Sequence, residues 1–238
     1  MPQAWHKGRP GHKKPQWRYL YLTGVFILLI LVRPFFHVMA IARLFTVAMV
    51  ASVWIAGPKR LIPRVILGFL TGLAAVWIVF SVFVPGMQTV PLHGWLAVSR
   101  AVLSAFFLFF CGAQLLASLL RTEHVMTDDM VGAINFYMIL GFAWAQFYTL
   151  LEIALPQSFQ LPLEYGSVPM ETYYETAASK FLYFSFVTQA TEGYGDIVPL
   201  STAAETLVIL QTTVGQLYLA LVVAYLLSVH VTQRLSGK

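Results

Sequence analysis

The sequence has little cysteine and little charge. Its one cysteine, Cys111, lies in an apolar run, so no disulfide can form within the chain and cysteine does not indicate a redox compartment. Charged residues make up 11% of the 238 residues, whereas soluble domains carry about 25%. The cysteine and histidine spacings of zinc and haem sites are also absent. These absences argue against a large soluble domain and give no reason to expect a cofactor.

Long apolar runs fill the chain instead, because 58% of its residues are hydrophobic. One membrane span takes about 20 apolar residues, and six spans account for about half of the sequence. We therefore expect an all-α membrane protein in a lipid bilayer. The predicted spans cover residues 17–37, 38–56, 62–84, 95–120, 130–155 and 205–230.

The charges that are present flank these runs. The formal net charge is +5, but membrane topology explains the flanking basic residues better than nucleic acid binding does. With both termini in the cytoplasm, most Lys and Arg fall on the cytoplasmic side, as the positive-inside rule requires. We expect a multi-pass protein of the cell (inner or plasma) membrane, with a basic tail at residues 1–18 that serves topology or binds anionic lipid. The outer acidic residues are then Glu164, Glu171, Glu175, Asp196 and Glu205.

The stretch Thr191-Glu192-Gly193-Tyr194-Gly195-Asp196 lies between a short amphipathic run (179–190) and the last apolar segment. A cation that crosses a membrane must exchange its water shell for other oxygens, and stacked backbone carbonyls can supply them. Gly193 and Gly195 allow the positive φ angles that such a lining needs. Thr191 adds a hydroxyl at the inner end, and Tyr194 adds a rigid ring behind the carbonyls. The alternative is a glycine-rich turn in an unrelated membrane protein.

These six residues resemble the potassium channel signature Thr-x-Gly-Tyr-Gly-Asp, and residues 182–188 and 196–199 resemble the pore helix and outer mouth of that family. The resemblance is to the six-span prokaryotic type with a single pore loop and no charged voltage-sensor helix. It covers residues 179–230 closely and the six-span layout more loosely. It implies a re-entrant pore helix and a selectivity filter, passive conduction of K⁺ and no enzymatic activity. One filter per chain implies a homotetramer, because four such loops surround the pore in that family.

The resemblance also implies roles for single residues of the filter. Permeant K⁺ ions would bind at Thr191, Glu192, Gly193 and Tyr194. The implied filter residues are Thr191, Glu192, Gly193, Tyr194 and Gly195, with Asp196 at the outer mouth.

The sixth span carries a second group of candidates. Gly215 would be a hinge for an inner gate, or would allow close helix packing through a small residue. Thr212, Thr213 and Gln216 would face the cavity below the filter and hold a hydrated ion there. Alternatively, these side chains bond the backbone or a neighbouring helix.

Two positions depart from the family pattern. Glu192 stands where Val, Ile or Leu is usual, and Ala190 stands where Thr is usual. A buried carboxylate is costly unless it is paired or neutralised. We therefore hypothesise that Glu192 is partly protonated behind the filter, or hydrogen-bonded by Thr188 or Gln189, and tunes conduction with pH. The alternative is a polar plug that does not titrate.

The resemblance divides the chain into three parts: the tail at 1–18, a four-helix membrane domain at 19–120, and a pore domain at 121–238. The pore domain would hold the fifth span, a turret, the pore helix, the filter and the sixth span. Capping-box patterns at 172–175 and 202–205 predict where the pore helix and the sixth span begin.

The four-helix domain resembles a voltage-sensor domain without gating charges. A sensor needs several charges, because each contributes only about 2.3 kcal/mol per 100 mV, and the fourth span offers Arg100 alone. These spans would scaffold the pore, bind lipid or sense another stimulus. No nucleotide-binding domain or calcium site follows the sixth span, so no soluble regulatory domain is expected.

Two other functions stay open. A weakly selective monovalent cation channel would result if Glu192 distorts the filter. A membrane transporter or membrane enzyme would need polar groups that converge inside the membrane. Outside the pore region the spans offer only scattered polar residues, among them Arg43, Gln114, Asn135, Gln146 and Glu152.

Overall fold

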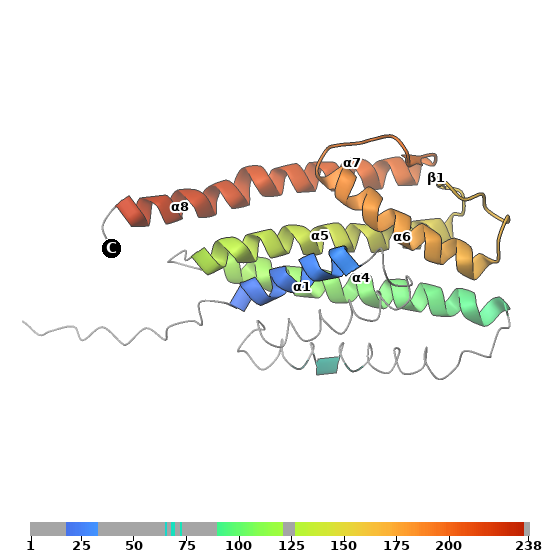
Figure 1. The fold of residues 1–238 in the computed structure, drawn as a ribbon, viewed down its shortest axis with the longest axis horizontal. Coiled ribbons are helices and arrows are strands. Elements are labelled where there is room, and N and C mark those ends of the chain that lie inside the picture. Colours follow the sequence, from blue (N-terminus) through green and yellow to red (C-terminus); the bar gives the residue numbers. More distant parts are fainter. Residues whose placement is uncertain are drawn as a thin grey trace, which may run out of the picture.

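The computed structural model describes residues 18–32, 65, 68–69, 72, 90–120 and 127–235. Within these residues the chain is almost entirely helical, and the long helices run side by side along the long axis of the molecule (Figure 1). The elements are α1 (Arg18–Val32), α4 (Val90–Leu120), α5 (Thr127–Ala154), β1 (Phe159–Gln160), α6 (Met170–Gln189), β2 (Val198–Pro199), α7 (Thr202–Leu217), η2 (Tyr218–Val223) and α8 (Ala224–Leu235).

Three helical stretches of the described chain are long and apolar enough to cross a membrane: Ala101–Leu120, Thr127–Ala154 and Thr202–Gln233. They correspond to the predicted fourth, fifth and sixth spans and confirm an all-α membrane protein. Helix α1 lies in the predicted first span and includes a shorter apolar helix, Tyr19–Leu28. The predicted second span, and the third apart from four isolated residues, lie outside the described residues.

Helix α5 is the centre of the described fold, because α1, α4, α6 and α7 all contact it. Small residues let its neighbours approach closely. A Cβ added to Gly132 would lie 3.0 Å from the Tyr19 ring, and one added to Gly141 would lie 2.8 Å from the Phe186 ring. Two apolar clusters form around α5. One joins it to α1, α4 and the end of the sixth span, and the other surrounds Tyr148 and Phe181 near β1.

The two predicted capping boxes are not the caps that form. Helix α6 begins at Met170, before the predicted range, and its N-cap residue Pro169 makes no side-chain cap bond. Helix α7 is capped by Ser201, whose hydroxyl accepts a hydrogen bond from the Ala204 amide at 3.2 Å. Ser201 directly precedes Thr202 and the first turn of α7. From that position its hydroxyl reaches the Ala204 amide, one of the first-turn amides that have no partner within the helix.

A short antiparallel pairing ties the segment after α5 to the segment before α7. Phe159 lies opposite Pro199, and Gln160 lies opposite Val198. The Ser158 carbonyl oxygen also accepts a hydrogen bond from the Leu200 amide at 2.7 Å. The two ends of the loop that contains α6 and the glycine motif are therefore closed by backbone hydrogen bonds.

The sixth span is continuous but not a uniform α-helix. Helix α7 passes into the π-helical segment η2 and then into α8. Tyr218 opens this segment and donates a hydrogen bond from its hydroxyl to the Ala133 carbonyl oxygen of α5 at 2.8 Å. Tyr218 and Leu226 are buried, whereas Tyr225 is exposed. Such π-turns are rare and are found frequently at functional sites.

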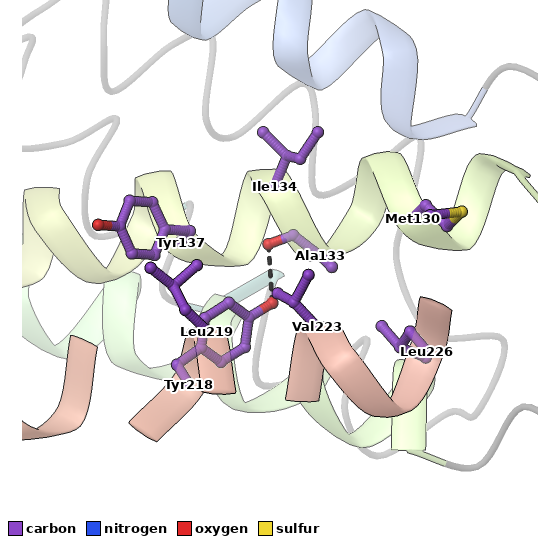
Figure 2. Close-up of a pocket in the computed structure, with 8 residues that line it drawn as sticks. All are labelled: Met130, Ala133, Ile134, Tyr137, Tyr218, Leu219, Val223 and Leu226. Atoms are coloured by element: carbon purple, nitrogen blue, oxygen red, sulfur yellow. Dashed lines mark hydrogen bonds between the residues drawn. The ribbon is translucent and has the colours of Figure 1, made fainter. Parts of the chain in front are cut away.

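A cavity of about 220 Å³ lies beside η2, between α5 and the sixth span (Figure 2). Its lining includes Ile134, Tyr137, Leu219 and Leu226. The Tyr137 and Tyr218 hydroxyls are bonded to backbone carbonyls, so the wall of the cavity is apolar.

Candidate functional site

The glycine motif forms the loop that follows α6, and its first turn is held by the end of that helix. The Thr191 amide donates to the Thr188 carbonyl oxygen at 3.0 Å, and the Glu192 amide donates to the Val187 carbonyl oxygen at 3.0 Å. Together with Thr191 at a positive φ of 62°, these bonds make a Schellman cap. A threonine is uncommon in this conformation, and the two cap bonds stabilise it here.

Beyond the cap, positive φ recurs at every second residue. The angles are 62° at Thr191, 55° at Gly193 and 78° at Gly195, while Glu192 and Tyr194 have no positive φ. Where residues of positive φ alternate with right-handed residues, successive N–H groups turn to one side of the chain and the carbonyls to the other; Thr191, Gly193 and Gly195 supply the positive-φ half of that pattern. The glycines adopt these angles without the steric penalty of a Cβ.

The loop is exposed in the single chain. All residues from Thr191 to Asp196 are exposed, and the Tyr194 ring, which we expected behind the carbonyls, is 67% exposed. The Thr191 hydroxyl, expected at the inner end, donates to the Ala190 carbonyl oxygen at 2.6 Å.

The end of the loop at Asp196 is attached to α6. The Tyr183 hydroxyl pairs with the Asp196 carboxylate; burial and this pairing raise the pKa of Tyr183. Tyr183 lies on α6, so the contact joins α6 to the end of the glycine motif. The loop is therefore held at both ends.

A network of buried polar side chains lies behind the start of the loop. The Gln189 side-chain amide donates to the Tyr137 carbonyl oxygen at 2.8 Å, and the Tyr137 hydroxyl donates to the Gln189 carbonyl oxygen at 3.0 Å. Ser185, one turn earlier on α6, donates from its hydroxyl to the Gly141 carbonyl oxygen at 2.6 Å. These bonds connect the last turn of α6 to α5 at two levels.

Gln211 of α7 completes the network. Its amide nitrogen donates to the carbonyl oxygen and to the hydroxyl of Ser185, both at 2.8 Å, and to the Gln189 side-chain oxygen at 3.4 Å. Its own side-chain oxygen accepts from the Tyr148 hydroxyl. Gln189, Gln211, Ser185 and Tyr148 are fully buried.

Glu152 forms a second buried polar centre, at the end of α5. One carboxylate oxygen accepts the Tyr173 hydroxyl at 2.6 Å and the Gln157 amide at 2.8 Å, and the other accepts the Ser158 amide at 3.1 Å. The carboxylate is fully buried. It therefore joins the fifth span, the loop before β1 and the start of α6.

The predicted residues of the sixth span divide by exposure. Thr213 and Gln216 are exposed, and the half-buried Thr212 donates from its hydroxyl to the Val208 carbonyl oxygen of its own helix at 2.9 Å. Gly215 is buried within α7, and a Cβ built on it would lie 3.2 Å from Gln189 Cγ. Gly215 thus sits where the sixth span approaches the end of α6, and the helix irregularity lies further on, in η2.

The contacts we hypothesised for Glu192 do not form. Glu192 is exposed in the single chain, and the Gln189 side chain bonds Tyr137 and Gln211 instead. Steric reach explains the difference, because Gln189 lies in the last turn of α6 and its side chain points into the α5–α6–α7 interior.

Sequence reasoning did not identify Gln211, Tyr148 or Ser185 as parts of the site. A glutamine inside an otherwise apolar span was the available signal, because a polar group in a membrane interior needs a partner. The described residues contain no group of three or more His, Cys, Asp or Glu side chains that could hold a metal ion.

Comparison with protein families gives a match. A protein-family model described as an ion channel matches residues 132–231, which run from α5 to α8. No curated protein and no solved structure matches the chain. The match supports an ion channel family, and with it passive ion conduction, for the part of the chain that holds the glycine motif and the buried network.

Proposed function

We propose that the chain is a potassium-selective channel that conducts K⁺ passively through a filter made by Thr191–Gly195. The observation that carries this proposal is the recurrence of positive φ at Thr191, Gly193 and Gly195. A backbone that alternates in this way can present successive carbonyls on one side, and carbonyl oxygens are the groups that replace the water shell of K⁺.

The proposal includes a homotetramer in the cell membrane. One chain supplies one wall of a pore, and its filter residues are exposed. The face of α7 that carries Ile209, Leu210, Val214 and Leu217 is apolar and exposed as well. Non-helical backbone at membrane depth is tolerated only where protein covers it or where it lines a water-filled cavity. Four copies around an axis would meet that requirement, with both termini cytoplasmic and Asp196 at the outer mouth.

A weakly selective cation channel is the second candidate, and Glu192 is the observation that favours it. Its carboxylate is exposed beside the filter backbone, where it would attract Na⁺ as well as K⁺. In Glu192→Val, a rise in the K⁺ to Na⁺ permeability ratio would assign the weaker selectivity of the wild type to this side chain.

The direct test uses the purified full chain in a planar bilayer with K⁺ on one side and Na⁺ on the other. We expect resolved unitary currents with a reversal potential displaced strongly from zero in the direction of K⁺ permeation. A reversal potential near zero would favour the weakly selective channel. Slow, saturating flux without unitary currents would overturn both channel proposals in favour of a transporter.

Gly195→Ala tests the filter backbone itself. An L side chain in the left-handed region costs about 1–2 kcal/mol, and the cost recurs in every copy. We expect Gly195→Ala to abolish K⁺ currents. Gly166→Ala is the matched control, because Gly166 has φ of 85° and, like Gly195, has open space where a Cβ would lie, but it belongs to the loop before α6. If Gly195→Ala conducts with the wild-type reversal potential, the filter assignment is wrong.

A further inference from the structure

The residue that connects the sixth span to the start of the filter is Gln211. It is fully buried, and it is the only point among the described residues at which a side chain of α7 donates hydrogen bonds to α6. The nitrogen and the oxygen of its side-chain amide bond different helices. The nitrogen reaches Ser185 and Gln189 of α6, and the oxygen receives the Tyr148 hydroxyl of α5.

Gln189 is contacted by α5 and by α7. Its carbonyl oxygen is bonded to the Tyr137 hydroxyl and its side-chain nitrogen to the Tyr137 carbonyl oxygen, so the peptide two residues before Thr191 has a fixed orientation. Gln211 reaches the remaining polar atom, the side-chain oxygen, at 3.4 Å. One turn further along α7, Gly215 lies against the Gln189 side chain. The sixth span therefore touches Gln189 at two successive turns.

The orientation of Gln189 bears on the filter through a short covalent path. Thr191 follows after Ala190, and the Thr191 and Glu192 amides are bonded back to the same last turn of α6. A shift of that turn would move the first carbonyls of the filter with it. Carbonyl positions set how well the filter replaces the water around an ion, so selectivity depends on what holds this turn.

We propose that Gln211 is a positioning residue for ion selectivity: it fixes the last turn of α6, and through it the Thr191 end of the filter, to the sixth span. This rests on the proposed channel function. Gln211 does not touch the permeant ion and acts through Ser185 and Gln189. Because Gln211 lies on the same span as η2, a movement of that span would displace the hydrogen bonds that it makes to α6 and so shift the start of the filter.

The test compares Gln211→Met with the wild type in planar bilayers under bi-ionic K⁺ and Na⁺ conditions. Methionine keeps the length and approximate volume of the side chain and removes every hydrogen bond. We expect the K⁺ to Na⁺ permeability ratio to fall by about tenfold, since buried partners lose a shared hydrogen-bonding group. A reversal potential is independent of how many channels fold and insert, so a merely structural role would lower the number of channels and leave it unchanged.

Gln146→Met is the matched control. Gln146 of α5 accepts a hydrogen bond from the Ser104 hydroxyl of α4 at 2.9 Å, on the side of α5 away from the filter. We expect the control to keep the wild-type permeability ratio. If Gln211→Met also keeps that ratio, or if both variants change it equally, the proposal is overturned.

Tyr148→Phe provides a second variant should Gln211→Met fail to assemble. It removes one hydroxyl, keeps the ring and leaves the Gln211 side-chain oxygen without its donor. We expect a smaller fall in the permeability ratio, by about threefold; an unchanged ratio would then overturn the proposal. A wild type that itself shows no K⁺ preference would instead contradict the proposed function, so the two failures are distinguishable.

Discussion

The two sides of α5 are bonded to different parts of the chain. Toward α1 and α4 the Phe26 and Phe142 rings stack at 5.4 Å, and Gly132 lies beneath Tyr19 and Leu119. The hydrogen bonds on this side, from Asn135 to the Tyr19 carbonyl oxygen and from Ser104 to Gln146, end far from the glycine motif. Toward α6 and α7 the contacts at Tyr137, Gly141, Tyr148 and Glu152 are hydrogen bonds that end on the loop-bearing helix or on the sixth span.

The difference separates stability from geometry. In a membrane, helices associate through packing and interhelical hydrogen bonds rather than through the hydrophobic effect. A hydrogen bond fixes both distance and direction, and those toward α6 and α7 end beside the glycine loop. We therefore propose that the α1–α4 side acts as a scaffold and that the α6–α7 side sets the shape of that loop. The predictions below test that division.

The largest expected effect on stability is that of Phe26→Ala. Phe26 is fully buried against Phe142, and truncating it leaves a cavity that costs about 3–5 kcal/mol of unfolding free energy. Thermal unfolding of the purified protein measures the loss. Phe109→Ala is the control, because Phe109 is 67% exposed and should lose little. The channels that still form should keep the wild-type reversal potential; an altered potential would contradict the scaffold role.

The next effect compares two glycines on opposite sides of α5. In Gly141→Ala the new Cβ would lie 2.8–2.9 Å from the Phe186 ring, and in Gly132→Ala it would lie 3.0–3.1 Å from Tyr19 and Leu119. Alanine raises helix propensity equally at both sites, by about 1 kcal/mol, so that term cancels in the comparison. We expect the unfolding free energy of Gly141→Ala to be lower than that of Gly132→Ala by about 1–3 kcal/mol, because the Cβ at 141 overpacks against the Phe186 ring.

Gly141→Ala should also change selectivity, because the Gly141 carbonyl oxygen accepts the Ser185 hydroxyl. Gly132→Ala should leave selectivity unchanged. Denaturation and bi-ionic reversal potentials measured on both variants decide the matter. Equal reversal potentials in the two variants would contradict the assignment of selectivity to the α6–α7 side of α5.

The smallest effect concerns pH and the start of α6. Burial, and then Tyr165, raise the pKa of Tyr174 to about 12, and burial followed by the Glu152 carboxylate raises the pKa of Tyr173. A raised pKa favours the neutral phenol in the folded chain. The stabilisation is therefore complete below about pH 10, the ordinary value for tyrosine, and is lost as pH rises toward about 12.

Melting temperatures measured across this alkaline range give the check. Wild-type stability should fall above about pH 10, and Tyr174→Phe should show a shallower fall. Identical profiles for the two proteins would show that Tyr174 does not contribute to the alkaline loss.

The sequence predicted the helical membrane class, three of the spans and the position of the glycine loop, because composition and glycine placement act locally. The helix caps were less predictable, since Ser201 and Thr202 are adjacent and both are good capping residues. The partners of Gln211 and Glu152 were not predictable, because they lie on other helices far along the chain. The contacts of Glu192 were mispredicted because nearness in sequence does not indicate where the Gln189 side chain points, and it bonds Tyr137 and Gln211 instead.

The π-helical turn in the sixth span determines which residues of α8 face α5. Two turns of an α-helix take about seven residues, so in a regular helix Tyr225 would return to the face of Tyr218. In this chain Leu226 does so, 1% exposed, while Tyr225 is 52% exposed. The wider turn absorbs one residue. Removing a single residue from Tyr218–Val223 would let a helix of ordinary pitch keep Leu226 against α5, whereas ordinary pitch imposed on the full segment would rotate everything after it by about 100° and carry Leu226 off that face.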